Sequence, residues 1–155
     1  MKLILVLLLL IKEYSAEDFN TISLQGKIIH ISTEMVDWYG ATDKCGENQW
    51  EMLTIKSPEE NTAVHQIIKD FPSDVLIGGY RFDGEKTWHW ANDRRAAVNY
   101  SNWQQGEPKL DTSEEPRIYC IYMQPSDGQW KSQWCAEEAP FICQDTQYID
   151  EIDDN

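Results

Sequence analysis

Apolar residues recur with a helical spacing in the first half of the chain, after a short strand-like stretch at residues 26–33. Over residues 34–45, Trp38, Ala41 and Cys45 fall on one face of a predicted helix. Gly40 lies inside this pattern and lowers the intrinsic helix propensity, so the predicted helix depends on packing for its stability.

A second predicted helix begins at Ser57, which heads the capping sequence Ser-Pro-Glu-Glu. Proline at the first helical position and Glu60 at the third are typical of a helix start. Pro72 ends the predicted helix. The apolar face that we expect it to bury is formed by Val64, Ile67, Ile68 and Phe71.

The second half of the chain changes to short strand-like stretches. They are predicted at residues 75–79, 87–93, 118–124, 129–135 and 139–144. Between them, residues 93–117 show little periodicity and many turn-forming residues, and loops of this length in compact domains usually carry function. Helices followed by strands around one large loop predict an α+β fold.

The N-terminus has the pattern of a signal peptide. A basic start is followed by an apolar run at residues 3–11 and by small residues before Glu17, whereas a membrane span needs about twenty apolar residues. We therefore expect a signal peptide at residues 1–16, a secreted domain at residues 17–145 and an acidic tail at residues 146–155.

The formal net charge of −14 limits the classes of partner. Such a surface repels phosphate backbones and anionic lipids, so neither nucleic acid nor a membrane is an expected partner. The sequence does not fix an oligomeric state.

Four cysteines lie in the predicted secreted domain: Cys45, Cys120, Cys135 and Cys143. An even number in an oxidising compartment predicts two disulfides, and their spacing does not fit a zinc site. The spacing alone leaves three pairings open.

A series of motifs in this order resembles the C-type lectin-like domain. The series runs from the helix with Trp and Cys through LIGG, WHW and NWQQGEP to DGQW and FIC. The resemblance implies a double-looped fold with two helices, two small antiparallel sheets and one long loop that carries a calcium and sugar site. It also implies the disulfides Cys45–Cys143 and Cys120–Cys135.

The loop departs from the calcium-binding pattern that the resemblance implies. Sugar-binding members carry Glu-Pro-Asn or Gln-Pro-Asp there, and calcium needs about six to eight oxygen ligands. Here Glu107 and Pro108 match, but Lys109 replaces the oxygen ligand with a cation. Ile118 stands where a further acid is expected.

The following strand departs from the pattern as well. Members of the family carry Trp-Asn-Asp, whereas Trp130 is followed here by Lys131 and Ser132. Glu107 is the one usual ligand that clearly remains, so no complete metal site is predicted. Calcium binding stays open only through Glu114 or Glu115 as a substitute ligand.

The two lysines suggest a replacement for the metal. We expect Lys109 and Lys131 each to be able to pair with Glu107, the alternative being that both point to water. Trp134 is the remaining ligand-binding candidate, since an exposed tryptophan can stack on a sugar ring or anchor a protein interface.

The other tryptophans are expected in the core, at positions 38, 88, 90, 103 and 130, whereas Trp50 fits that pattern less well. The QPSD sequence at residues 124–127 resembles a galactose motif but is predicted to be a turn. Asn99 begins a glycosylation sequon, whose glycan would crowd the long loop.

No arrangement of His30, His65 and His89 predicts a catalytic centre, so no enzyme activity is expected. The sequence favours a secreted recognition module that binds a carbohydrate or glycoprotein through the long-loop face. The alternative is a calcium-independent protein-interaction factor, such as a soluble antagonist or complex subunit.

Overall fold

The computed structural model describes residues 19–109 and 116–145, without the side chains of residues 93–95. The expected signal peptide and acidic tail lie outside these ranges. Neither helix of the described part has the length and apolar character needed to span a bilayer.

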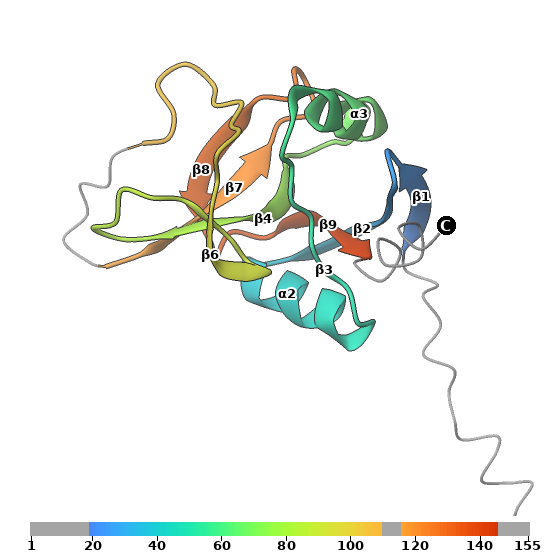
Figure 1. The fold of residues 1–155 in the computed structure, drawn as a ribbon, viewed down its shortest axis with the longest axis horizontal. Helices are drawn as coiled ribbons and strands as arrows, with labels where there is room; N and C mark the ends of the chain where they lie inside the picture. The colour runs from blue at the N-terminus through green and yellow to red at the C-terminus, as the bar shows by residue number, and fades with distance from the viewer. Residues whose placement is uncertain (1–18, 110–115, 146–155) are drawn as a thin grey trace, which may run out of the picture.

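Two capped helices lie on opposite sides of the strands (Figure 1). Helix α2 spans Trp38–Glu47, and its N-cap Asp37 accepts a hydrogen bond from the Gly40 amide at 2.8 Å. Helix α3 spans Pro58–Ile68, and its N-cap Ser57 accepts from the Glu60 amide at 3.1 Å. The second helix therefore starts as the capping sequence predicts.

The prediction that the first helix starts at residue 34 is wrong. Strand β2 continues over Lys27–Val36, and Val36 still pairs with Ala139 of the last strand. Asp37 has an extended backbone and caps the helix with its carboxylate, so the helix begins only at Trp38.

The strands form one mixed sheet. Their bounds are β1 Asn20–Leu24, β2 Lys27–Val36, β3 Glu51–Met52, β4 Val75–Phe82, β5 His89–Trp90, β6 Asp93–Ala97, β7 Ile118–Met123, β8 Trp130–Trp134 and β9 Ala139–Asp145. The region predicted as a structureless loop thus begins with a strand, β6, which pairs with β5.

The sheet consists of two antiparallel groups. One group holds β1, β2, β3 and β9, and the other holds β4 to β8. A single parallel pair, Leu76 with Phe141, joins them through β4 and β9. The α+β architecture is therefore confirmed, and the two small sheets implied by the resemblance are continuous here.

The core consists of two clusters. One contains Trp88, Trp90 and Trp130, with Trp103 packed against it, and the other contains all four cysteines, with Trp38 at its edge. Of the five tryptophans predicted as core residues, Trp88, Trp90 and Trp130 are buried, and Trp38 and Trp103 are partly buried against the clusters. The disulfides are Cys45–Cys143 and Cys120–Cys135, as the resemblance implies.

Trp50 also packs against the second cluster. Its indole stacks on the His30 ring at a centroid distance of 3.4 Å. Burial lowers the pKa of His30, and the charge of Asp145 opposes this shift. This histidine therefore belongs to the packing of the domain.

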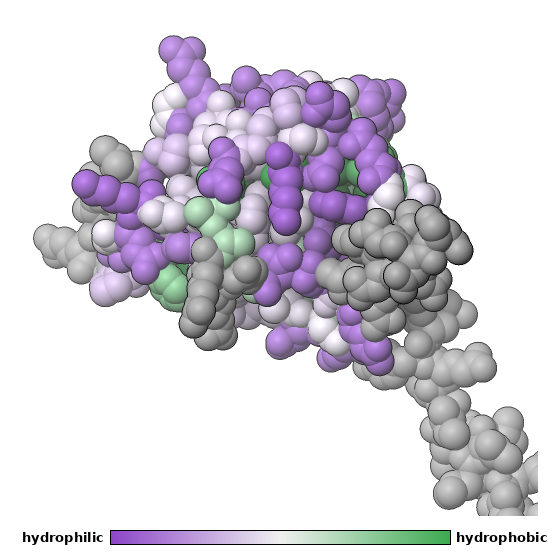
Figure 2. Space-filling view, viewed as in Figure 1, coloured by the Kyte–Doolittle hydropathy of each residue, from purple (hydrophilic) through white to green (hydrophobic). Residues whose placement is uncertain are grey.

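The described ends of the chain lie away from the long loop. Asn20 pairs with Ile31, and Asp145 pairs with Ile28 on the same strand, so both ends meet at β2. Figure 1 shows the loop that follows β6 on the opposite side of the molecule from β1. The surface seen in the same view is mostly hydrophilic (Figure 2).

Candidate functional site

Strand β8 holds the start of the long loop through its backbone. The Trp130 amide donates to the Asn102 carbonyl at 2.7 Å, and the Gln104 amide donates to the Trp130 carbonyl at 2.9 Å. Trp103 forms a parallel bridge with Trp130 between these two bonds. The loop therefore enters the site as an additional short strand beside β8.

A polar network on the core side fixes the same start of the long loop. The Trp130 indole N–H donates to Asn61 Oδ1 at 2.8 Å. The side-chain amides of Asn61 and Asn102 both donate to the Gly128 carbonyl, at 3.0 and 2.9 Å. We call Asn61, Asn102, Gly128 and Trp130 the buried anchor, because buried Asn61 and Trp130 and partly buried Asn102 join helix α3 to the loop.

Further along the loop, Glu107 is held by Ser132 of β8. Glu107 Oε2 accepts from the Ser132 hydroxyl at 2.7 Å, from the Ser132 amide at 3.0 Å and from the Lys109 amide at 3.1 Å. The Lys109 amide also donates to Ser132 Oγ at 2.9 Å. These three residues, which we call the Glu107 latch, fix the described tip of the loop.

The side chains of the Glu107 latch differ greatly in exposure. The Glu107 side chain is 7% exposed, whereas that of Lys109 is 74% exposed. The Lys109 ammonium lies 3.8 Å from Glu107 Oε1, so a cation does face this carboxylate. An ion pair whose cation is so exposed contributes little to stability, and the hydrogen bonds from Ser132 hold the carboxylate.

Lys131 does not pair with Glu107. Its ammonium forms an ion pair with Asp74, next to a hydrogen bond from Gln133 to the same carboxylate oxygen. Side chains alternate along a strand, so Ser132 faces the loop while Lys131 points to the other side of the sheet. The expectation that both lysines serve Glu107 is therefore wrong for Lys131.

Trp134 lies at the end of β8, on the same side of the strand as Ser132. Its side chain is exposed, and the Arg117 guanidinium lies 4.5 Å from the centre of its ring. A cation at this distance over an indole is attracted to its π face. The Arg117 guanidinium therefore stacks over the Trp134 ring, while much of the indole remains accessible to a ligand.

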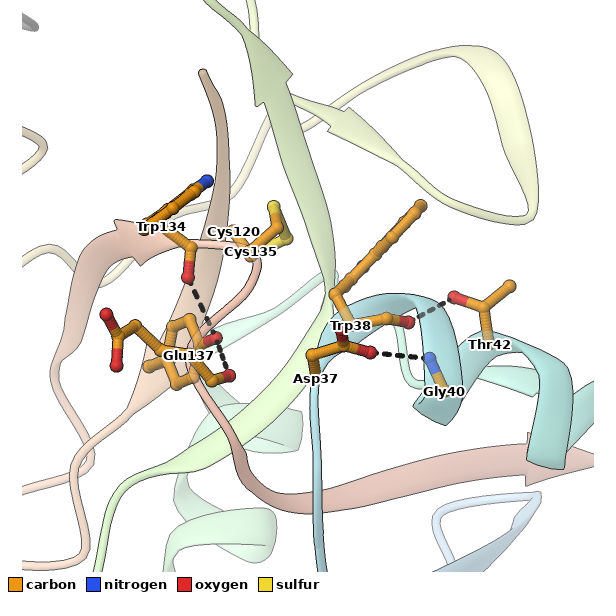
Figure 3. Close-up of a disulfide and its surroundings, with 9 residues drawn as sticks. Asp37, Trp38, Gly40, Thr42, Cys120, Trp134, Cys135 and Glu137 are labelled. Carbon is orange, nitrogen blue, oxygen red and sulfur yellow. Dashed lines mark hydrogen bonds between the residues drawn. A yellow bond between two sulfur atoms is a disulfide. The ribbon is translucent and has the colours of Figure 1, made fainter. Parts of the chain in front are cut away.

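The Cys120–Cys135 disulfide supports Trp134 (Figure 3). Figure 3 shows Trp134 and Trp38 on either side of this disulfide, with the carbonyls of Trp134 and Glu137 directed at one phenol. This phenol belongs to Tyr122, and its hydroxyl donates to the Trp134 carbonyl at 3.3 Å and to the Glu137 carbonyl at 2.8 Å. Its burial raises the pKa of Tyr122, so the phenol stays neutral and donates.

The described residues do not fit the calcium site that the resemblance implies. Three N–H or O–H donors occupy Glu107 Oε2, and the Lys109 ammonium approaches Oε1. Calcium needs several oxygen ligands together, and Ile118 offers none. In residues 19–109 and 116–145 no three His, Cys, Asp or Glu side chains gather as a metal site.

The substitute ligands considered from the sequence, Glu114 and Glu115, lie outside the described residues. Asn99 is exposed shortly after the end of β6, and Ser101 of its sequon is exposed too. The QPSD stretch forms the predicted turn between β7 and β8, closed by a 2.9 Å bond from the Gly128 amide to the Gln124 carbonyl.

Sequence reasoning missed three contributors to the site: Asn61, Ser132 and Arg117. The period of β8 could have identified Ser132, because it shares a face with the core residue Trp130. The partnership of Asn61 with Trp130 spans 69 positions, and no local pattern indicates it.

Comparison with known proteins identifies the family. Residues 34–145 match the model of the lectin C-type domain, and the chain belongs to this family. E-selectin of Bos taurus is 27% identical over 116 residues, which cover 74% of this chain and 24% of that protein. The chain thus spans about a quarter of the length of this relative.

Solved structures share the fold. The carbohydrate-recognition domain of a mouse scavenger receptor C-type lectin superposes with a TM-score of 0.72 at 24% identity, covering 81% of this chain and 94% of that domain. The cow CD23 carbohydrate-recognition domain, solved in the presence of a GlcNAc2Man3 oligosaccharide, gives 0.68 at 25% identity and covers 81% and 92%.

Proposed function

We propose that the chain is a secreted recognition module that binds a glycan or glycoprotein through its long-loop face without a complete calcium site. We call the surface formed by the Glu107 latch, Arg117 and Trp134 the loop face. The proposal includes a signal peptide at residues 1–16, for which the apolar run and the two disulfides are the support. It includes no catalytic activity.

The observation that carries the proposal is the Glu107 latch. The hydroxyl and amide of Ser132 both donate to the carboxylate that the resemblance assigns to calcium binding. The loop is thereby held in place by the protein's own donors. A ligand would then be recognised by direct contacts.

Trp134 supplies the contact surface. Its ring is 43% exposed beside the Arg117 guanidinium, and this pair offers a flat apolar face next to charged donors. Aromatic rings pack well against the apolar faces of sugars, while guanidinium groups donate to hydroxyl or carboxylate oxygens. The relatives whose structures are called carbohydrate-recognition domains support a glycan as ligand.

A glycan array probed with the mature protein in calcium and in EDTA tests this proposal. We expect sugar-dependent binding that is equal in both buffers and that Trp134→Ala weakens about tenfold. Ile22→Ala is the matched control, because Ile22 is also an exposed large apolar residue but lies on β1. Binding that EDTA abolishes, or a melting temperature that calcium raises, would overturn the calcium-independent reading.

A second candidate is a calcium-independent protein-interaction factor, a soluble antagonist or complex subunit. The Trp134–Arg117 pair favours it, since tryptophan and arginine are enriched among residues that dominate protein interfaces. Binding to a purified glycoprotein that survives enzymatic removal of its glycans, with no signal on the array, would support this candidate over the first.

A further inference from the structure

A second surface lies on the opposite side of the sheet from Trp134. On β7, Tyr119 pairs with Trp134, whereas its neighbours Ile118 and Cys120 pair with Phe82 and Tyr80 of β4. Alternation along β7 therefore places Phe82 and Tyr80 on the side that faces helix α2. A groove of about 420 Å³ opens there, and we call it the aromatic groove.

Aromatic rings form the walls of the aromatic groove. The Tyr80 ring lies 5.4 Å from Trp38 and 5.6 Å from Phe82, and the Trp38 ring lies 5.5 Å from Tyr39. Tyr80 is buried as the floor, while Tyr39 and Phe82 are 48% and 46% exposed. Two of the large exposed apolar residues in the described chain thus border a single groove.

The charged group at the groove is acidic. Glu85 lines it with a half-exposed carboxylate that lies 3.5 Å from His89 Nε2. Arg81 donates to the Glu85 carbonyl at 2.8 Å and so holds the turn, but its guanidinium stacks near Trp88 and Tyr119. No lysine or arginine is among the described residues that line the groove.

We propose that the aromatic groove binds an arginine side chain presented by a protein partner. The faces of aromatic rings attract cations, and a guanidinium can stack on a ring while donating to a carboxylate in the same plane. The rings, the Glu85 carboxylate and the net charge of −14 all favour a basic partner. This surface is separate from the loop face and does not depend on the function proposed for it.

A nuclear magnetic resonance titration of the mature protein tests the proposal. The probes are N-acetyl-arginine methylamide and N-acetyl-citrulline methylamide, which has nearly the same shape without the charge. We expect the arginine compound to shift the Trp38 indole N–H signal and to bind about fivefold more tightly than the citrulline compound. The Trp134 indole signal should not move with either probe.

Variants locate the binding. Glu85→Gln and Phe82→Ala should each weaken binding of the arginine compound about threefold, whereas Ile22→Ala should leave it unchanged. Phe82 and Ile22 are both exposed apolar residues on strands, so the substitutions are matched in their effect on folding.

Two results would overturn the proposal. Equal affinity for the arginine and citrulline compounds would define the groove as apolar rather than cation-selective. Tetramethylammonium binding as tightly as the arginine compound would identify a site for small organic cations instead of a partner's side chain.

Discussion

The long loop is attached to β8 twice, and the two attachments differ in kind. At the buried anchor, Asn61 and Trp130 satisfy each other within the core. At the Glu107 latch, a carboxylate and a serine meet beside an exposed lysine. Strand β8 thus carries two attachments of the loop: the buried anchor is part of the core, and the Glu107 latch is part of the loop face.

The difference shows which part of a binding loop can change. The buried anchor joins groups from α3, the loop and β8, and a substitution of Asn61 or Trp130 there leaves a buried polar partner unsatisfied. The Glu107 latch needs only a hydrogen-bond donor opposite the carboxylate, and Ser132 supplies this donor. A substitution at the Glu107 latch is therefore expected to disturb the frame of the loop less than one at the buried anchor.

The largest expected effect is at the buried anchor. Asn61→Ala leaves the Trp130 indole N–H without its acceptor and removes a donor from Gly128, so we expect a loss of about 2–3 kcal/mol in the free energy of unfolding. Urea denaturation measures it. Asn92→Ala is the matched control, because Asn92 bonds Glu51 at an exposed position. Equal losses for the two variants would show that the buried anchor has no special role.

At the Glu107 latch, Ser132→Ala removes the hydroxyl that donates to Glu107 and accepts from Lys109. We expect a smaller loss of about 1–2 kcal/mol, because the Ser132 amide still donates to the carboxylate. Urea denaturation again measures it, and limited proteolysis at the loop should accelerate. Ser126→Ala, at an exposed turn position, is the control. A loss as large as that of Asn61→Ala would abolish the distinction between the two attachments.

The two lysines sharpen the comparison further. Lys131→Met breaks a half-buried ion pair with Asp74, and we expect a loss of about 1 kcal/mol. Added salt should reduce the difference from the wild type only slightly, since partly buried pairs are weakly screened. Thermal unfolding at low and high ionic strength measures this, and no loss at either would contradict the pairing.

The smallest effect is expected at Lys109. Its ammonium is 3.8 Å from Glu107 and 74% exposed, so Lys109→Met should cost about 0–0.5 kcal/mol at low salt. The same thermal unfolding experiment measures it beside Lys131→Met. A loss that exceeds that of Lys131→Met would mean that the cation, rather than Ser132, holds the carboxylate.

Much of the frame follows from local patterns in the sequence. The capping box at Ser57 fixes the start of α3, and the ordered motifs led to the family and with it to both disulfide pairs. The predicted start of α2 is too early because residues 34–36 are compatible with both the helical and the strand period. The pairing of Val36 with Ala139 places these residues in strand β2. Tertiary pairing of this kind leaves no local signal.

The site was less predictable than the frame. The sequence shows directly that Lys109 departs from the calcium pattern. The side of the sheet that Lys131 faces follows only when the alternation of side chains is applied residue by residue along β8. The aromatic groove combines α2, β4 and the turn after it, so its residues are scattered along the sequence.

The meeting of both described chain ends at β2, away from the loop, has a practical consequence. A copy tethered through either end directs its loop away from the point of attachment (Figure 1). On a bead or a lipid vesicle, many such copies would present their loops outward together. Avidity can then exceed the affinity of one site by about 10²–10⁴ without any new contact, so weak single-site binding becomes measurable in this format.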